Sequence, residues 1–264
     1  MERIMMLEGK NAIIYGAGGP VGGGIAKAFA REGARVFLTG RGQDKLDRLA
    51  KEITEAGGRA ETAVVDALDE DAVAEHARSV AAQGGIHISL NLISRGDVQG
   101  VPLMRMAADD FTRAITKGVT ATFITAKVAA RHMSEQGSGV ILAFNSGSAH
   151  SSPMMGSTGP ADAAIDTFIR NLALEVGPNG VRVLGIWAAG IPETLTPERL
   201  ATVNSDMQLD EAALEGLKNN LAAMRMSKRS PSLTEVAEVA VFLASDRSSG
   251  MTGTFTNVTQ MFTS

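Results

Sequence analysis

Residues 16–24 form a glycine-rich segment that reads Gly-Ala-Gly-Gly-Pro-Val-Gly-Gly-Gly. Glycines permit a tight turn and let backbone N–H groups approach a pyrophosphate, and a helix that starts there adds partial positive charge. A glycine pattern alone is weak evidence, because a purely structural turn produces the same pattern. This one directly follows an apolar run and opens a helical pattern, so it predicts a nucleotide-binding loop.

Two charged residues follow the next two apolar runs. The first run ends at Gly40 and Arg41, where an acidic residue would bind a ribose 2′-hydroxyl, whereas an arginine can pair with a 2′-phosphate. We therefore expect NADP(H) rather than NAD(H), the alternative being that Arg41 is a solvated surface residue. Asp66 ends the second run and can accept a hydrogen bond from adenine, or it can cap the next helix, as Asp69 equally could.

Strand and helix patterns alternate along the chain and must position these residues. Strands are expected at residues 11–15, 35–39, 61–65, 86–93, 139–145, 182–187 and 253–258, with helices at 25–31, 45–56, 69–82, 109–136, 160–176 and 233–244. This alternation implies a parallel sheet covered on both faces, with ligand at the carboxyl ends of its strands. We expect one Rossmann-type, doubly wound α/β domain spanning residues 1–264.

Residues 191–230 break the alternation. The segment is rich in proline, asparagine, methionine and charge, and is expected to carry one or two helices. It predicts a lid over the pocket, the alternative being a surface excursion without a gating role.

Composition excludes several classes of partner. The formal charge is −4 and aromatic residues make up 4%, which does not fit a nucleic-acid surface. No apolar run approaches the ~20 residues that span a bilayer. With no cysteine, thiolate chemistry and cysteine-bound metals are excluded, and no metal site is expected. The first ten residues carry scattered charges and no signal-peptide layout, so a cytoplasmic location is expected.

The order of these motifs resembles the short-chain dehydrogenase/reductase family from Gly9 to about Val258. Three further segments carry the resemblance: GVILAFNS at 139–146, NLALEVGPNGVRV at 171–183 and VAEVAVFLASD at 236–246. It implies a nicotinamide-dependent oxidoreductase acting on a carbonyl or hydroxyl of a small molecule, assembled as a homodimer or homotetramer. It also implies that Ser146 is catalytic. The cofactor-binding residues it implies are Gly16, Gly19, Val21, Gly22, Arg41, Asp66, Asn91, Ile191 and Thr194.

The rest of the family's catalytic set is missing. The chain has one tyrosine, Tyr15, and no Tyr-x-x-x-Lys motif. Counting on from Ser146, the family's tyrosine and lysine fall on Gly159 and Ala163, and the asparagine of the long helix falls on Gly118. Pro20 replaces the middle glycine of the phosphate loop and has no N–H to donate.

Two residues near Ser146 are candidate substitutes for the missing acid. His150 is a candidate because histidine is a common general acid, the alternative being an ordinary surface histidine. With Gly159 as N-cap and Pro160 at the first helical position, Asp162 falls at the third, where a carboxylate favours the helix dipole. The other interpretation of Asp162 is a carboxylic acid that faces the cleft.

Methionines gather in three segments that the resemblance places beside the substrate pocket. They are Met104 and Met106, Met154 and Met155, and Met207, Met224 and Met226. Flexible thioethers suit an apolar substrate, although core or interface packing would also explain them.

Three functions remain open at this point. The first is an NADP(H)-dependent oxidoreductase with a non-standard proton donor. The second is a non-redox enzyme, such as a lyase, isomerase or cyclase, on the same scaffold. The third is a catalytically inactive nucleotide-binding subunit.

Overall fold

A seven-stranded sheet forms the centre of the protein. The computed structural model describes residues 5–150, 154–207 and 209–260, and orders the strands β3-β2-β1-β4-β5-β6-β7. Every neighbouring pair is parallel. The strands are β1 (Asn11–Tyr15), β2 (Arg35–Gly40), β3 (Arg59–Val64), β4 (Ile88–Asn91), β5 (Gly139–Asn145), β6 (Val181–Trp187) and β7 (Thr254–Asn257). The prediction of a Rossmann-type, doubly wound single-domain fold is confirmed.

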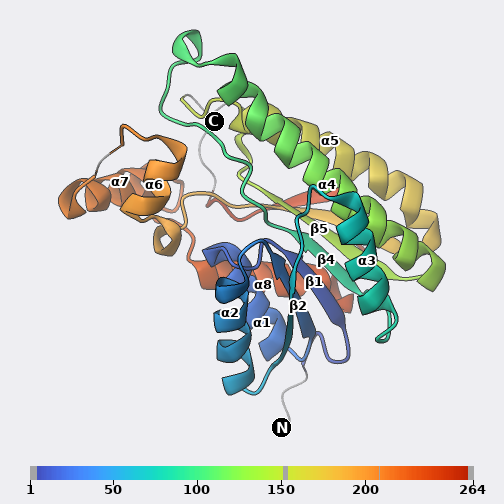
Figure 1. Cartoon of the computed structure of the whole chain (residues 1–264). Helices are drawn as coiled ribbons and strands as arrows, with labels where there is room; N and C mark the ends of the chain where they lie inside the picture. Colours follow the sequence, from blue (N-terminus) through green and yellow to red (C-terminus); the bar gives the residue numbers. More distant parts are fainter. Residues whose placement is uncertain (1–4, 151–153, 208, 261–264) are drawn as a thin grey trace.

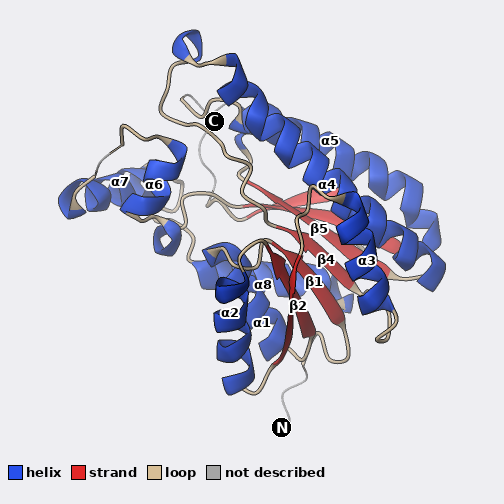
Figure 2. Ribbon diagram, viewed as in Figure 1, coloured by secondary structure: helices blue, strands red, loops and turns tan. Residues whose placement is uncertain are grey.

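Helices cover both faces of the sheet (Figures 1 and 2). One layer holds α1 (Pro20–Arg31), α2 (Gln43–Glu55) and α8 (Leu233–Ala244), and the other holds α3 (Glu70–Ala81), α4 (Ala108–Gln136) and α5 (Thr158–Val176). Successive side chains of a strand point to opposite faces, so Ile14 packs with the first layer and Ile13 with the second. Strand β1 is buried along its whole length because both of its faces are covered.

The order of the strands reverses between β1 and β4. From β1 the chain proceeds to β2 and β3 on one side, then crosses to β4 and continues to β7 on the other. In the register of the sheet, Tyr15 pairs with Thr39 of β2 and with Asn91 of β4. A crevice opens beyond the carboxyl ends of two such strands, which is where open α/β sheets bind ligands.

Two helices start earlier than their sequences predict. Helix α1 begins at Pro20, which places Gly22 inside the helix. Only glycine fits at position 22, because a Cβ there would lie 2.5 Å from the Gly16 carbonyl oxygen. Helix α5 begins at Thr158 with Ser157 as its N-cap residue. Asp162 is therefore the fifth helical residue, and the prediction that it occupies the third was wrong.

The predicted insertion contains two short helices on the carboxyl side of the sheet. They are α6 (Pro197–Val203) and α7 (Glu211–Ala223), preceded by the 3-10 turn η4 (Pro192–Thr194). Thr196 caps α6 by accepting from the Arg199 N–H, and Asp210 caps α7 by accepting from the Ala213 N–H. In Figure 1 the two helices project apart from the main helical layers.

Within the described ranges, no helix has the length and apolar character to cross a bilayer. The same residues contain no cluster of histidine and acidic side chains that could hold a metal ion.

Candidate functional site

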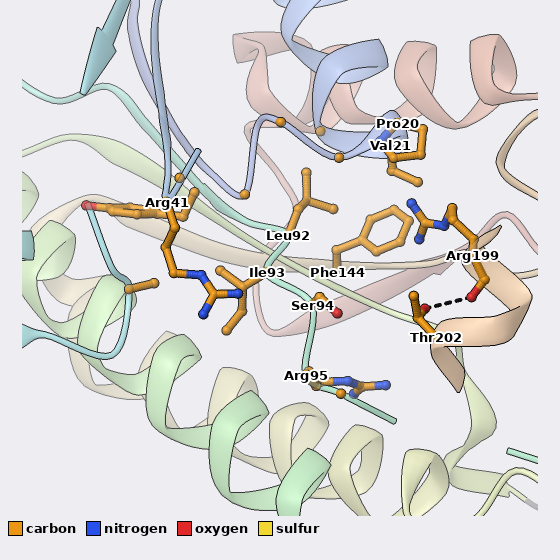
Figure 3. A pocket seen from close by; sticks show the side chains of 18 of the residues that line it. Pro20, Val21, Arg41, Leu92, Ile93, Ser94, Arg95, Phe144, Arg199 and Thr202 are labelled. Atoms are coloured by element: carbon orange, nitrogen blue, oxygen red, sulfur yellow. Dashed lines mark hydrogen bonds between the residues drawn. The ribbon is translucent and has the colours of Figure 1, made fainter. Parts of the chain in front are cut away.

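A cavity of about 970 Å³ follows the carboxyl ends of the central strands. Its size lies near the top of the ~300–1,000 Å³ range of small-molecule sites. The wall is continuous from the glycine loop and Arg41 to Ser146 at the end of β5 and Thr194 in η4. Figure 3 shows the middle of this cavity, with Arg41 and Arg199 on opposite sides.

The glycine loop has the geometry that a phosphate group requires. Gly16 has φ +82°, and a Cβ there would lie 2.6 Å from the Leu92 carbonyl oxygen, so only glycine fits. Helix α1 has no side-chain cap and no acidic residue in its first turn. Among the described residues, the N–H groups of Val21 and Gly22 have no acceptor, and Pro20 supplies no N–H. The loop therefore presents two free donors and the positive end of a helix to the cavity.

Three cations line the cavity where β2 passes into α2. They are Arg41, which the sequence predicted, and Lys45 and Arg48, which it did not. The surplus of positive charge at this edge fits an anionic ligand group.

Asp66 lies on the cavity wall, and its alternative role as a helix cap is taken by another residue. Asp69 caps α3 by accepting from the Ala72 N–H at 3.0 Å. Asp66 accepts from the Leu68 N–H through Oδ1 at 3.0 Å, a local turn that leaves Oδ2 available.

Ser146 is held by a buried carboxylate. Asp162 is fully buried, and its Oδ2 accepts from Ser146 Oγ at 2.6 Å, from Ser146 N at 3.1 Å and from Ser148 N at 3.0 Å. Its Oδ1 accepts from Arg95 Nη1 at 2.7 Å. Ser146 and Arg95 line the cavity and Asp162 does not, so Asp162 acts from behind them.

Arg95 brings a positive charge beside Ser146. Its Nε and Nη2 also donate to the two Asp97 oxygens at 3.2 and 2.8 Å. Burial alone would lower the pKa of Arg95, but Asp97 and Asp162 outweigh it and raise that pKa. The side chain lies over Gly118, where a Cβ would meet Arg95 Cδ at 2.5 Å. Arg95 thus fills space beside the position of the family's helix asparagine.

The face of α5 that meets Ser146 carries Thr158 and Asp162, which are one helical turn apart. Thr158 lines the cavity, and its Oγ1 donates to Asp97 at 2.9 Å. Gly159 and Ala163, where counting from Ser146 places the family's tyrosine and lysine, do not line it. A Cβ on Gly159 would lie 2.8 Å from the Ser148 carbonyl oxygen, and Ala163 is exposed.

A second buried acid braces the strands behind the site. Asp166, one turn beyond Asp162, accepts from Asn145 Nδ2 at 2.8 Å and Trp187 Nε1 at 3.2 Å. Burial raises the pKa of Asp166, against the lowering effect of these hydrogen bonds. The contact joins the ends of β5 and β6 next to Ser146.

Other predicted site residues lie in different surroundings. Thr194 lines the cavity, whereas Ile191 is buried beside it. The Asn91 side chain points away, donating to Thr125 Oγ1 at 3.2 Å and accepting from the Ile93 N–H. His150 is exposed, packs edge-on against Trp187 and does not line the cavity.

The methionine segments do not form the cavity wall, which corrects the expectation that they border it. None of the seven methionines lines it. Met104 is fully exposed, and Met224 and Met226 are each 59% exposed. The wall contains instead charged residues that sequence reasoning missed: Lys45, Arg48, Arg95, Asp97, Lys117 and Arg199. Arg95 lies just beyond the strand expected at residues 86–93, and no pattern in the sequence pointed to it.

Comparisons with known proteins agree with this geometry. A family model described as enoyl-(acyl carrier protein) reductase matches residues 16–260. Oxidoreductase YxbG of Bacillus subtilis is 30% identical over 248 residues, covering 94% of this chain and 88% of that protein. The 7alpha-hydroxysteroid dehydrogenase of Escherichia coli is 31% identical over 201 residues, covering 74% and 78%.

Solved structures show the same fold over nearly the whole chain. A 7 alpha-hydroxysteroid dehydrogenase complexed with NADH and 7-oxo glycochenodeoxycholic acid has a TM-score of 0.84 at 28% identity, covering 98% of this chain and 97% of that one. An NAD+-bound xylitol dehydrogenase has a TM-score of 0.85 at 26% identity, covering 97% and 99%. From the family model, the relatives and the fold together, the chain belongs to the short-chain dehydrogenase/reductase family of oxidoreductases.

Proposed function

We propose that this protein is an NADP(H)-dependent oxidoreductase that acts on a carbonyl or hydroxyl group without the family's usual tyrosine and lysine. The observation that carries the proposal is the continuous cavity between the free N–H groups of α1 and the side chain of Ser146. The glycine geometry and the cations around Arg41 fit a phosphorylated dinucleotide. A bound nicotinamide would supply or accept the hydride.

Arg95 and Ser146 are the groups placed to bind the substrate oxygen. A guanidinium has five N–H donors, and three of those on Arg95 are used by Asp97 and Asp162. The remaining two can stabilise negative charge that develops on a substrate oxygen, because preorganised donors in a dry site act most strongly on charge. Asp162 keeps Arg95 and Ser146 in place.

The proton donor is non-standard in this proposal. The Ser146 hydroxyl has both Asp162 and Ser148 as neighbours, with the two serine oxygens 2.7 Å apart. Of these three groups only Ser146 lines the cavity, so its hydroxyl is the one that a substrate oxygen can meet. Of the earlier candidates, we therefore keep Asp162 as a positioning residue behind Ser146, and we assign no role to the exposed His150.

The preference for the 2′-phosphate is tested by binding. NADPH and NADH fluorescence are titrated against the wild type, against Arg41→Gln and against Arg247→Gln, an exposed arginine outside the cavity wall. We expect NADPH to bind more tightly than NADH, and Arg41→Gln alone to reduce the difference by about tenfold, the worth of a charge-assisted contact. Absence of NADPH binding at millimolar cofactor would overturn the proposal.

Redox chemistry is tested with a panel of ketones and aldehydes, following NADPH oxidation by absorbance. Ser146→Ala should lower any turnover strongly while leaving NADPH affinity unchanged, because Ser146 follows β5 and β4 lies between that strand and β1, which leads into the phosphate loop. Tight NADPH binding with no turnover on the panel would favour the alternative of a non-redox or inactive nucleotide-binding member. The observation that favours this alternative is that the Ser146 hydroxyl donates to the buried Asp162 carboxylate, with no tyrosine beside it.

A further inference from the structure

Arg199 is a cation on the cavity wall that has no side-chain partner among the residues the structure describes. It lies on α6, in the insertion between β6 and α8, and its backbone is fixed by the Thr196 cap and by the Thr202 hydroxyl, which donates to the Arg199 carbonyl at 2.6 Å. Its guanidinium makes no hydrogen bond or ion pair with any described residue. Arg199 is exposed as a whole, and desolvation of the part of its side chain that lies against the wall lowers the pKa of Arg199 below its ordinary value.

The Arg199 side chain is directed at the phosphate loop. In Figure 3 it extends from α6 towards Pro20 and Val21, across the cavity from Arg41. The neighbouring wall consists of Val21, Phe144 and Leu200, which offer no charge to neutralise it. A cation that faces the positive end of a helix would be repelled by it, so the arrangement gains from an anion placed between the two.

Pro20 explains why a cation near the phosphate loop would be useful. As the first residue of α1 it lacks the N–H that a glycine at this loop position would donate. The loop thus has one backbone donor fewer at the place where Arg199 approaches from the opposite wall. A guanidinium suits the vacancy because it can bind phosphate oxygens through two parallel N–H groups.

We propose that Arg199 binds the pyrophosphate of the dinucleotide from the side opposite to α1, in place of the donor that Pro20 lacks. The inference rests on the proposed cofactor site and adds to it a residue from the 191–230 segment. It gives that segment a role, because a bound dinucleotide would join α6 to the phosphate loop. The predicted lid would then close on the cofactor itself.

Two ligands distinguish a pyrophosphate contact from a contact with the nicotinamide, and NADH, which lacks the 2′-phosphate, should lose affinity by the same factor if the contact is not with that group. NADPH and 2′-phospho-ADP-ribose share the adenosine, the 2′-phosphate and the pyrophosphate, and differ in the nicotinamide. Dissociation constants are measured by NADPH fluorescence and by displacement of NADPH with 2′-phospho-ADP-ribose. The variants are Arg199→Gln, Arg199→Lys and the control Arg247→Gln, whose side chain is exposed and outside the cavity.

Arg199→Gln should weaken both ligands to the same extent, by about tenfold or more, as expected for loss of a charge-assisted hydrogen bond. Arg199→Lys should recover part of the loss, and Arg247→Gln should match the wild type. Because the Arg199 guanidinium contacts no charged or hydrogen-bonding group in the described part of the chain, the thermal unfolding of Arg199→Gln should equal that of the wild type.

Other results overturn the inference. Unchanged affinity of Arg199→Gln for NADPH shows that Arg199 does not contact the cofactor. Weakened NADPH with unchanged 2′-phospho-ADP-ribose moves the contact to the nicotinamide end, and an equal loss in Arg247→Gln makes the effect one of net charge. Failure of the wild type to bind NADPH is a different result, because it removes the proposed cofactor site as a whole.

Discussion

Asp162 and Arg95 lie beside Ser146 because they contact each other, and the sequence does not show this contact. Asp162 was expected either to favour the helix dipole or to face the cleft, yet it does neither. Its partner Arg95 lies 67 positions away, on a loop with no motif, and only the fold brings the two together. Sequence reasoning identified residues that come just after a strand, such as Arg41 and Asp66, more readily than those defined by a distant contact.

Asp162→Asn tests how much the contacts of Asp162 with Arg95 and Ser146 contribute to the free energy of unfolding. The amide keeps the volume, but its NH₂ group cannot accept from donors that now face a carboxylate, and Arg95 retains only Asp97 as a counter-charge. We expect the free energy of unfolding to fall by about 2–3 kcal/mol, as for other buried charged hydrogen bonds. Urea denaturation at pH 7 measures it, with Asp246→Asn, whose side chain is 84% exposed, as the control. Equal stability of the two variants would contradict a structural role for Asp162.

At the scale of elements, the bounds that follow from buried apolar residues were predicted well. The helix starts that depend on close backbone contacts were not. Strands β1 and β5 and helix α8 have the predicted bounds, because their apolar periodicity reflects the core. The start of α5 was misplaced because Pro160 suggested a first helical position. Proline also fits the third, where the N–H again has no partner within the helix.

Replacing each of two helical glycines by alanine tests how closely α5 packs against the segment that follows Ser146. Gly159 is the crowded position, and Gly216 is the uncrowded control. Alanine is the better helix former by up to about 1 kcal/mol, so Gly216→Ala on α7, with nothing within 4 Å of its new Cβ, should stabilise the protein. Gly159→Ala should destabilise it by about 1–3 kcal/mol, because its Cβ would lie 2.8 Å from the Ser148 carbonyl oxygen and the backbone must shift. Chemical denaturation of both variants measures the difference. If Gly159→Ala were as stable as Gly216→Ala, α5 would not approach Ser148 as closely as described.

For the whole molecule, the alternation of strands and helices was enough to predict a doubly wound parallel sheet, because few other arrangements cover both faces of parallel strands. The positions of α6 and α7 could not be predicted, since neither helix buries a residue fully. Their relation to the cavity depends on a few side chains, of which Arg199 is one.

The expected homo-oligomer can be tested on the outer surface of α4 and α5. Phe123 is 44% exposed there, packs edge-on against Phe168 with ring centroids 5.8 Å apart, and so offers an apolar contact to a second copy. We expect light scattering to give a mass of two or four chains, and Phe123→Asp to lower it. A mass of one chain for the wild type at micromolar concentration would contradict this expectation.

The packing of Arg95 over Gly118 restricts the order in which this site can evolve. A side chain at position 118 collides with an arginine whose guanidinium is fixed by two carboxylates, so an asparagine can be accepted there only after Arg95 has been shortened. Shortening Arg95 first would leave Asp162 buried without its counter-charge, an intermediate that is itself penalised. Either of these two substitutions is thus unfavourable on its own, and an asparagine at position 118 requires coordinated changes at both positions.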